Sequence, residues 1–471
     1  MNLARWQAGD TIAGRWRVHE VLSGPYGVVY VVFDAQSGEM LAAKAFSDVL
    51  QGWDRVLPHR IKKETLPWLK LPEHQNLVRP RFVHSVDGCP LLFMEYVCGT
   101  QLGQLIGSTS LTDDPATVLR LAIQLCEGLE FAQSNGVGAH RDIKPGNCLI
   151  TSQGVLKVTD PGLLRAIDDS LIATAGDGRS SARARTRADI AALVHGRQME
   201  DDKYGVAAAA YLAPEQFTAS KHVDQRADIY GFGVLLFEMV TGKLPFVARS
   251  WAEYEQAHRN NEPPPLPAVR QMFSDVIRTC LSKDAPRRFT DFTAVRRQLA
   301  QLLRSLTGDG DVLPLEGDEL EAEIHDNQGL GLLNFGYLRE AFSAFERALE
   351  FSPDHPVLWA HKGEALRQLG QSEEALVCHQ VSLELDAKCV AAWYHRGLAL
   401  RVLERFKEAL VCHERALELN PRCWQAWMDK GLTLAALGDH GAELACYDRV
   451  RQLNPRAASM RRGPGAAARL T

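Results

Sequence analysis

The sequence contains no long apolar run. None of its hydrophobic stretches approaches the roughly 20 consecutive apolar residues that a membrane-spanning helix needs. Its first residues, MNLARWQAGDTIAG, also lack the apolar core of a secretion signal. We therefore expect no membrane partner and a cytoplasmic location.

The sequence also has no excess of positive charge. It carries 53 lysine and arginine residues against 58 aspartate and glutamate residues, which gives a formal net charge of -5. A protein dedicated to nucleic acid or to anionic lipid needs a basic surface to meet the phosphates. We therefore expect proteins and small molecules as partners, and no nucleic acid.

Closely paired cysteines are absent too. The ten cysteines include no CxxC pair, so neither a zinc ribbon nor a disulfide framework is indicated. Five of them follow a period of 34 residues instead: Cys378, Cys412 and Cys446 form one series, and Cys389 and Cys423 form another. This spacing predicts small buried positions of a structural repeat, not metal ligands or reactive thiols.

The overall amino-acid composition is typical of a folded globular protein. Hydrophobic residues make up 46% of the 471 residues and charged residues 24%, which supplies enough apolar material for a substantial core. A chain of this length should hold two to four domains, at roughly 100 to 200 residues per domain. Two domains account for the motifs that the sequence contains.

The last third of the chain is a tandem repeat. Aligned on the period of 34, it forms four units, residues 322–355, 356–389, 390–423 and 424–457. The eighth position of each unit is glycine, where two helices need a close approach, and the thirty-second is proline or alanine, where a helix stops. Position 20 is alanine except for Glu443, which predicts looser packing in the last unit. The recurring residues are Gly329, Gly363, Gly397 and Gly431; Pro353, Ala387, Pro421 and Pro455; and Trp359, Trp393 and Trp427.

This pattern resembles the tetratricopeptide repeat (TPR). The resemblance implies an all-α solenoid, because one helix pair cannot bury its apolar face alone and neighbouring pairs must stack. The concave surface of such a solenoid usually holds a peptide or helix of a protein partner. Two alternatives stay open: the repeats brace the rest of the chain, or they self-associate into a homo-oligomer.

The first 300 residues carry a second set of motifs. The stretch HEVLSGPYGVVYVVFD alternates in strand fashion around small residues, and a turn, AQSGE, leads to a further strand, MLAAKAF. Next come FMEYV at 93–97, HRDIKPGN at 140–147, Asp160, APE at 213–215, DIYGFG at 228–233 and DAPRRFT at 284–290. In this order the motifs resemble a eukaryotic-like serine/threonine protein kinase of the bacterial branch.

Together the two resemblances imply an α+β bilobal protein-kinase fold followed by an all-α TPR solenoid. We place the kinase domain at residues 10–305, a linker at 306–321, four TPR repeats at 322–457 and a flexible tail at 458–471. The linker begins with an acidic, glycine-rich stretch that suits a domain boundary.

The kinase resemblance implies ATP and Mg2+ as cofactors and protein hydroxyls as acceptors, since phosphoryl transfer depends mainly on positioning and on neutralising charge. It implies that Asp142 orients the acceptor hydroxyl and that Lys144 neutralises the γ-phosphate. It implies Asn147 and Asp160 as the magnesium ligands. Lys144 also favours serine and threonine over tyrosine as the acceptor.

The same resemblance implies a set of ATP contacts. Lys44 holds the α- and β-phosphates and is oriented by an ion pair with Glu64. The other implied contacts are Gly24 and Gly27 in the phosphate loop, Val29 in the following strand, and Met94, Glu95 and Val97 in the hinge. Each residue taken singly has a simpler interpretation, such as an exposed strand lysine or a turn-forming aspartate, but their joint spacing favours a catalytic site.

Three further residues have structural roles by resemblance. Asp228 braces the catalytic loop from its helix, and Glu215 pairs with Arg288 to hold the larger lobe together. Because breaking a buried ion pair leaves an uncompensated charge, we expect loss of Arg288 to reduce folded yield before it alters chemistry.

The sequence departs from the family pattern at two positions. Leu22 stands where the first glycine of the phosphate loop would fall, which alters the cover over the phosphates. Pro161 replaces the phenylalanine that follows the metal-binding aspartate and packs beneath the helix carrying Glu64. Pro161 narrows the conformations of its loop but touches neither the carboxylate of Asp160 nor Gly162, so we expect regulation to be affected more than chemistry.

The segment between Asp160 and Glu215 is longer than expected for an activation segment. It includes GRSSARARTR at 178–187, rich in arginine and hydroxyl groups. In the family, the arginine before the catalytic aspartate, here Arg141, receives a phosphate from this segment. The candidate phosphorylation sites are Thr174, Ser180, Ser181 and Thr186. The alternative is a solvated linker with incidental serines.

These motifs predict an ATP- and magnesium-dependent serine/threonine protein kinase whose repeats recruit protein partners. Two rival hypotheses belong to other classes. One is a nucleotide-binding pseudokinase that acts as a scaffold without turnover, and the other is a repeat-driven assembly protein with a vestigial kinase part.

Overall fold

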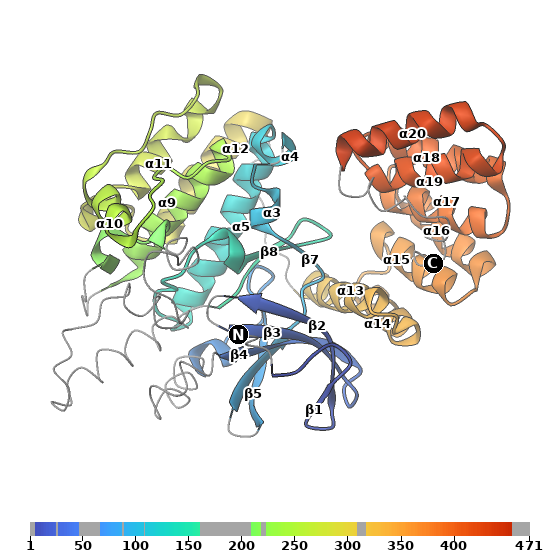
Figure 1. The fold of residues 1–471 in the computed structure, drawn as a ribbon, viewed down its shortest axis with the longest axis horizontal. Coiled ribbons are helices and arrows are strands. Elements are labelled where there is room, and N and C mark those ends of the chain that lie inside the picture. Colours follow the sequence, from blue (N-terminus) through green and yellow to red (C-terminus); the bar gives the residue numbers. More distant parts are fainter. Residues whose placement is uncertain are drawn as a thin grey trace. The chain divides into compact units, whose positions relative to one another are not determined.

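The computed structural model describes residues 5–24, 27–46, 66–86, 89–107, 109–160, 209–217, 223–308 and 317–454. The chain forms two compact units that divide between Leu315 and Glu316 (Figure 1). The first unit has a β-rich lobe followed by a helical lobe, and the second is all-helical. No helix among these described residues is long and apolar enough to cross a membrane.

The β-rich lobe is a six-stranded antiparallel sheet with the strand order β1-β2-β3-β4-β6-β5. Its strands alternate between a buried apolar face and a second face, as half-buried strands do. Trp16, Tyr30 and Phe93 fill the buried side. The strands are β1 Thr11–Ile12, β2 Trp16–Gly24, β3 Gly27–Asp34, β4 Glu39–Phe46, β5 Pro80–Val86 and β6 Cys89–Glu95.

The helical lobe surrounds α5 Pro115–Ser134 and α9 Gln225–Thr241 and carries a small three-stranded sheet in the order β7-β8-β9. The strands of that sheet are β7 Gly99–Gln101, β8 Cys148–Thr151 and β9 Leu156–Val158. The remaining helices and turns are α3 Leu102–Leu105, α4 Thr109–Thr112, η1 Pro145–Asn147, η2 Pro214–Phe217, α10 Trp251–Asn260, η3 Ala268–Phe273, α11 Ser274–Cys280, η4 Ala285–Arg287 and α12 Phe292–Thr307.

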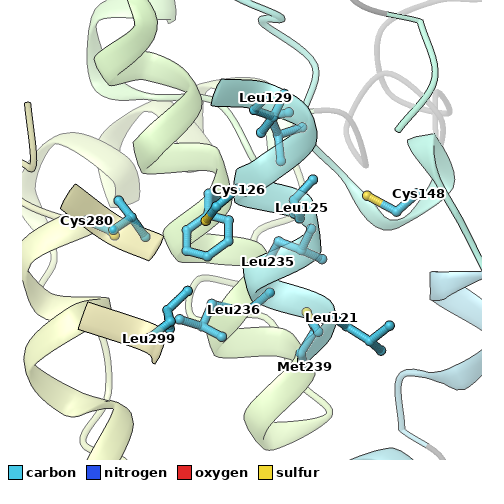
Figure 2. Close-up of a cluster of buried hydrophobic side chains, with 14 of the residues drawn as sticks. Leu121, Leu125, Cys126, Leu129, Cys148, Leu235, Leu236, Met239, Cys280 and Leu299 are labelled. Carbon is cyan, nitrogen blue, oxygen red and sulfur yellow. The ribbon is translucent and has the colours of Figure 1, made fainter. Parts of the chain in front are cut away.

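The core of this lobe is built where α5, α9, α11 and α12 meet. Figure 2 shows leucines and three cysteines of these elements and of β8 gathered in one apolar cluster. Cys126, Cys148 and Cys280 are buried there, and burial raises the pKa of all three thiols. They are core residues of a packed interior, which is how small apolar cysteines usually serve.

Backbone hydrogen bonds join β9 to the segment that precedes β5. Val78 N donates to Val158 O at 2.8 Å, and Val158 N donates to Asn76 O at 2.9 Å. A glycine of α5 makes room for this contact, because a Cβ at Gly128 would lie 2.6 Å from the Asn76 carbonyl oxygen. Strand β9 leads directly to Asp160, so these bonds position the aspartate relative to the β-rich lobe.

The second unit consists of paired helices with the predicted period. The second helix of each pair ends two residues before position 32, and in the first three units the proline or alanine at this position lies outside the helix. The helices are α13 Asp318–Asn334, α14 Leu338–Phe351, α15 Pro356–Gln368, α16 Ser372–Leu385, α17 Val390–Val402, α18 Phe406–Leu419, α19 Trp424–Ala436 and α20 His440–Leu453.

The repeated glycines accommodate a ring from the paired helix, not only a close backbone. A Cβ at Gly329 would lie 2.5 Å from the Phe345 ring, and a Cβ at Gly363 would lie 2.4 Å from the His379 ring. Gly397 faces His413 and Gly431 faces Tyr447 in the same way. The repeat therefore needs glycine at position 8 because an aromatic or imidazole ring occupies position 24.

The repeated tryptophans close the junctions between units. The indole Nε1 of Trp359 donates to Pro353 O at 2.7 Å, and Trp393 and Trp427 make the same bond to the carbonyl at position 32 of the unit before them. Of the periodic cysteines, Cys378, Cys389, Cys412 and Cys446 are buried as predicted, whereas Cys423 is partly exposed.

Two histidines at position 24 should make the repeats sensitive to acid. His379 and His413 are fully buried, their ring nitrogens have no hydrogen-bond partner among the described residues, and burial lowers the pKa of both to about 3. The unfolded chain takes up these protons near pH 6.5 and the folded chain does not, so stability falls as pH drops below 6.5. At pH 5 the loss is about 2 kcal/mol per histidine.

We expect replacement of both histidines by phenylalanine, the residue that the first unit carries as Phe345, to remove this acid sensitivity. Hydrogen exchange in α16 and α18 of the full chain, compared at pH 7 and pH 5 after correction for intrinsic rates, measures the effect. Replacement of the exposed His355 by glutamine is the control and should leave the pH dependence unchanged. An equal loss of protection in the double variant and the unmodified chain would contradict the prediction.

Candidate active site

A cavity of about 780 Å3 lies between the β-rich lobe and the loops of the helical lobe. This volume is within the range of small-molecule sites. Most of the sequence-predicted site residues line it. They are Gly27, Val29, Lys44, Met94, Glu95, Val97, Asp142, Lys144, Asn147 and Asp160.

The sheet supplies the first wall of the cavity. Val29 of β3 and Lys44 of β4 are direct partners across the antiparallel pair, so both side chains lie on one face. Gly24 pairs with Gly27 where β2 and β3 are joined. Leu22, which replaces the first glycine of the loop, also lines the cavity and is 46% exposed.

The carboxylate of Glu95 is held inside the protein at the hinge. Arg79 N donates to Glu95 Oε1 at 3.0 Å, and Glu95 N donates to Arg79 O at 2.8 Å. Lys157 of β9, which is 2% exposed, places its Nζ 3.4 Å from the same Oε1. The side chain of Glu95 therefore ties the hinge to the strand that leads to Asp160.

The residues of the HRDIKPGN loop converge on Asp142. Its Oδ2 accepts hydrogen bonds from Lys144 Nζ at 2.6 Å and from Asn147 Nδ2 at 2.9 Å. Burial alone would raise the pKa of Asp142, but the charge and hydrogen bond of Lys144 and the hydrogen bond of Asn147 hold it below its ordinary value. Asp142 is therefore an ionised carboxylate next to a fixed positive charge.

A buried carboxylate, that of Asp228, supports this loop. Asp228, in the first turn of α9, accepts hydrogen bonds from His140 N at 2.7 Å and from Arg141 N at 2.6 Å. Arg141 has a φ of 66°, a left-handed conformation that costs an arginine free energy and that these two bonds maintain. The His140 ring lies 2.9 Å from Thr159 O and so connects the loop to the residue before Asp160.

Lys44 and Asp160 meet across the cavity. Lys44 Nζ lies 2.6 Å from Asp160 Oδ2, and the other carboxylate oxygen, Oδ1, is buried without a hydrogen-bond partner among the described residues. Asp160 also has a left-handed φ of 64°. The predicted partner of Lys44, Glu64, lies outside the described residues, so this ion pair stays a prediction.

Away from the cavity, Arg288 and Glu215 form a two-pronged ion pair. Arg288 Nη1 and Nη2 donate to the two carboxylate oxygens of Glu215 at 2.7 and 2.9 Å. The arginine side chain is completely buried and also donates to the carbonyl oxygens of Ser282 and Arg226, both at 2.8 Å. Its guanidinium lies 4.9 Å from the Tyr230 ring.

The arrangement brings two lysines, two carboxylates and an amide to one cavity large enough for a nucleotide. The protein kinase domain family matches residues 17–301. This chain belongs to the protein kinase family. Tetratricopeptide repeat families match residues 344–377, 390–423 and 412–458, so the kinase domain is followed by TPR repeats, as predicted.

Curated proteins from several bacteria are similar to this chain. The probable serine/threonine-protein kinase PknB of Lactococcus lactis is 28% identical over 62% of this chain and 43% of its own length. The serine/threonine-protein kinase PksC of Streptomyces coelicolor is 28% identical over 63% of this chain and 51% of its own length. The kinase thus spans about half or less of the length of these curated relatives.

A solved structure also resembles the kinase domain. The crystal structure of the Mycobacterium tuberculosis PknI kinase domain matches 63% of this chain and 98% of its own, with 22% sequence identity and a TM-score of 0.46.

Several predicted features of the kinase lie outside the described residues. Among them are Pro161, which replaces the family's phenylalanine, and Gly162. The four candidate phosphorylation sites, Thr174, Ser180, Ser181 and Thr186, lie there too. Phosphorylation of these sites therefore stays a prediction.

Sequence reasoning missed two residues of the kinase site. Lys157 was not singled out because a lysine within a short strand reads as solvent-exposed, and only the fold buries it against Glu95. His140 belongs to the quoted motif but received no role, although its ring and its backbone amide join the catalytic loop to Thr159 and Asp228. No local signal in the sequence identifies either contact.

Proposed function

We propose that this kinase transfers the γ-phosphate of ATP to serine and threonine hydroxyls of proteins, with Mg2+ as its cofactor. One observation carries the proposal: a single cavity of about 780 Å3 is lined by Lys44, Asp142, Lys144, Asn147 and Asp160. The words "serine/threonine-protein kinase" in the names of its relatives support the acceptor class. Lys144 is the residue that this branch of the family carries in the catalytic loop.

Each of these residues has a separate role in the transfer. Asp142 is ionised, so its carboxylate accepts a hydrogen bond from the acceptor hydroxyl and aims the oxygen at the γ-phosphate. Lys144, 2.6 Å from Asp142, provides a positive charge for the phosphoryl group while it is transferred. Lys44 on β4 provides a second positive charge for the α- and β-phosphates. Asp228 keeps the catalytic loop in the conformation that these roles need.

Asp160 and Asn147 fit a magnesium ion. Carboxylate and amide oxygens are ligands that Mg2+ accepts, and a buried carboxylate oxygen without a partner, such as Asp160 Oδ1, costs free energy unless a cation or donor reaches it. When bound, the ion supplies charge that neutralises the phosphates. Lys44 forms an ion pair with Asp160 and so helps to orient the carboxylate of Asp160.

We infer that the TPR repeats recruit protein substrates or regulators, because a stacked solenoid presents an extended surface that a peptide or helix can occupy. Bracing of the chain and assembly into a homo-oligomer are the alternatives. We assign the reaction to the cytoplasm, where ATP is available.

Transfer of label from ATP to a generic acceptor protein tests the proposal. The purified full chain is incubated with magnesium and with ATP labelled at the γ-phosphate, beside the Asp142→Asn and Lys44→Ala variants. Label incorporation well above that of both variants supports a kinase. Incorporation equal in all three contradicts the proposal and favours a nucleotide-binding scaffold.

A further inference from the structure

Opposite charges meet at two of the junctions between TPR units. Position 7 of a unit is a lysine that pairs with a glutamate at position 25 of the unit before it. Lys362 Nζ lies 3.1 Å from Glu346 Oε1, and Lys430 Nζ lies 3.0 Å from Glu414 Oε1. We call such a contact a rung. Each rung joins the first helix of one unit to the second helix of the preceding unit.

The middle junction breaks this pattern. Its position 7 is Arg396, and the residue at position 25 of the preceding unit is Gln380 instead of glutamate. Gln380 donates from Nε2 to Glu384 on its own helix at 2.9 Å and supplies no negative charge. In the part of the chain that the structure describes, Arg396 has no ion-pair partner, and its Nε is buried without a hydrogen-bond partner.

The positive charge of Arg396 is otherwise placed like those of the two lysines. Its guanidinium lies 5.9 Å from the Trp393 ring, and the lysines lie 5.5 and 5.7 Å from the equivalent tryptophans. Glu408 of α18 is an acid whose pKa the charge of Arg396 helps to lower, but the main cause of that lowering is its hydrogen bonding to Arg405. Glu408 is therefore already paired, and the charge of Arg396 is not neutralised.

Exposed aliphatic side chains lie on the two helices against which α17 packs. Val377 of α16 is 64% exposed and Val411 of α18 is 60% exposed. Val377 lies three residues before Gln380 on the same helix face, and Val411 lies three residues after Glu408. Helix α17, which carries Arg396, packs against both α16 and α18. The first and last units carry Ser343 and Ala445 at the position of these valines, so the aliphatic pair occurs only at the middle junction.

We propose that Val377, Gln380, Arg396 and Val411 form a docking surface for an acidic, aliphatic segment of a partner protein. We call it the open-rung surface. A carboxylate of the partner takes the place that Glu346 and Glu414 occupy in the closed rungs, and guanidinium and carboxylate make strong paired hydrogen bonds. Aliphatic residues of the partner cover the two valines.

Fluorescence anisotropy with the full chain tests the proposal. The probe is a short labelled peptide in which leucine and glutamate are separated by glycine and serine, and the reference peptide has glutamine in place of each glutamate. We expect the glutamate peptide to bind at least tenfold more tightly than the reference. The Arg396→Gln variant should lose this preference.

A second variant tests the surface without removing the arginine. Gln380→Glu supplies the missing acid from within the chain, so it should close the rung, raise the melting temperature slightly and weaken binding of the glutamate peptide at least tenfold. Lys430→Gln is the matched control, because its rung is already closed, and should leave peptide binding within twofold.

Three outcomes would overturn the proposal. They are equal binding of the two peptides, unchanged binding by both Arg396→Gln and Gln380→Glu, and no binding at all. Because the readout is peptide affinity, these outcomes are independent of whether the kinase domain is active.

Discussion

Replacement of Asp142 by asparagine is expected to lower kcat for phosphoryl transfer by about 10³-fold while nucleotide binding stays within a few-fold. The size of the loss follows from the usual contribution of a positioned acid–base group, about 10² to 10⁴-fold. Asparagine retains the shape of the side chain but carries no negative charge for the acceptor hydroxyl. In the unmodified protein Lys144 Nζ lies 2.6 Å from Asp142 Oδ2, and in the variant Lys144 would lose this ionic partner.

The two measurements separate chemistry from binding. Steady-state transfer of labelled phosphate gives kcat, and titration with a fluorescent ATP analogue gives the affinity of the cavity. An unchanged affinity with a large loss of kcat is expected for a residue that acts on the acceptor. A variant with undiminished kcat would show that Asp142 has no part in the reaction.

A matched substitution distinguishes a loss of catalysis from a loss of folded structure. Asp142 faces the cavity, whereas Asp228 is buried and binds the backbone amides of His140 and Arg141. We expect Asp228→Asn to lower kcat and the melting temperature together, because the loop loses a bracing acceptor. Asp142→Asn should lower kcat without a comparable change in melting temperature.

Residues close together in the sequence were the easiest part of the site to predict. Asp142, Lys144 and Asn147 lie within six residues, and the short turn η1 that follows Lys144 turns the chain back on itself. Their side chains meet as a result of that local geometry, so the motif alone implied the cluster. Recognition of the family motif supplied their roles.

Contacts between distant segments could not be predicted in this way. The pairing of Lys157 with Glu95 depends on how β9 packs beneath the hinge, and nothing in either local sequence indicates it. The contact of Lys44 with Asp160 was not predicted either. The predicted pair of Lys44 with Glu64 stays a prediction, because Glu64 lies outside the described residues. Such pairings are decided by the burial of charge in the folded lobes, which a single sequence does not display.

The repeats were predicted more completely because each unit contacts only its neighbours. The period of 34 residues was enough to predict the positions of the repeated glycines, prolines and buried cysteines within each unit. The reason for glycine at position 8 was only partly foreseen, because a ring at position 24, such as His379, occupies the space beside Gly363. Exceptions to the period, such as Gln380, became informative only when the structure showed the ion pairs of the equivalent junctions.

The largest expected effect on stability comes from Arg288→Ala. Arg288 is completely buried and binds both oxygens of Glu215, and it also donates to backbone carbonyls of Ser282 and Arg226. Its removal takes this donor from two backbone carbonyls and from the carboxylate of Glu215, whose side chain is 26% exposed. Breaking a buried pair of this kind costs about 3 to 5 kcal/mol.

The neighbouring residue provides a control for this substitution. Arg287 is 81% exposed, and its Nε lies 3.5 Å from the exposed carboxylate of Asp284, so Arg287→Ala should change the free energy of unfolding by less than about 0.5 kcal/mol. Unfolding of the full chain in urea, monitored by the hydrogen-exchange protection of α9, measures the free energy of unfolding of both variants. Equal effects of the two substitutions would mean that the pair with Glu215 does not stabilise the lobe. A large loss restricted to Arg288→Ala would mean that this guanidinium joins the segment 209–217 to the start of α9 and to the turn η4. The start of α9 carries Asp228, which fixes the conformation of the catalytic loop.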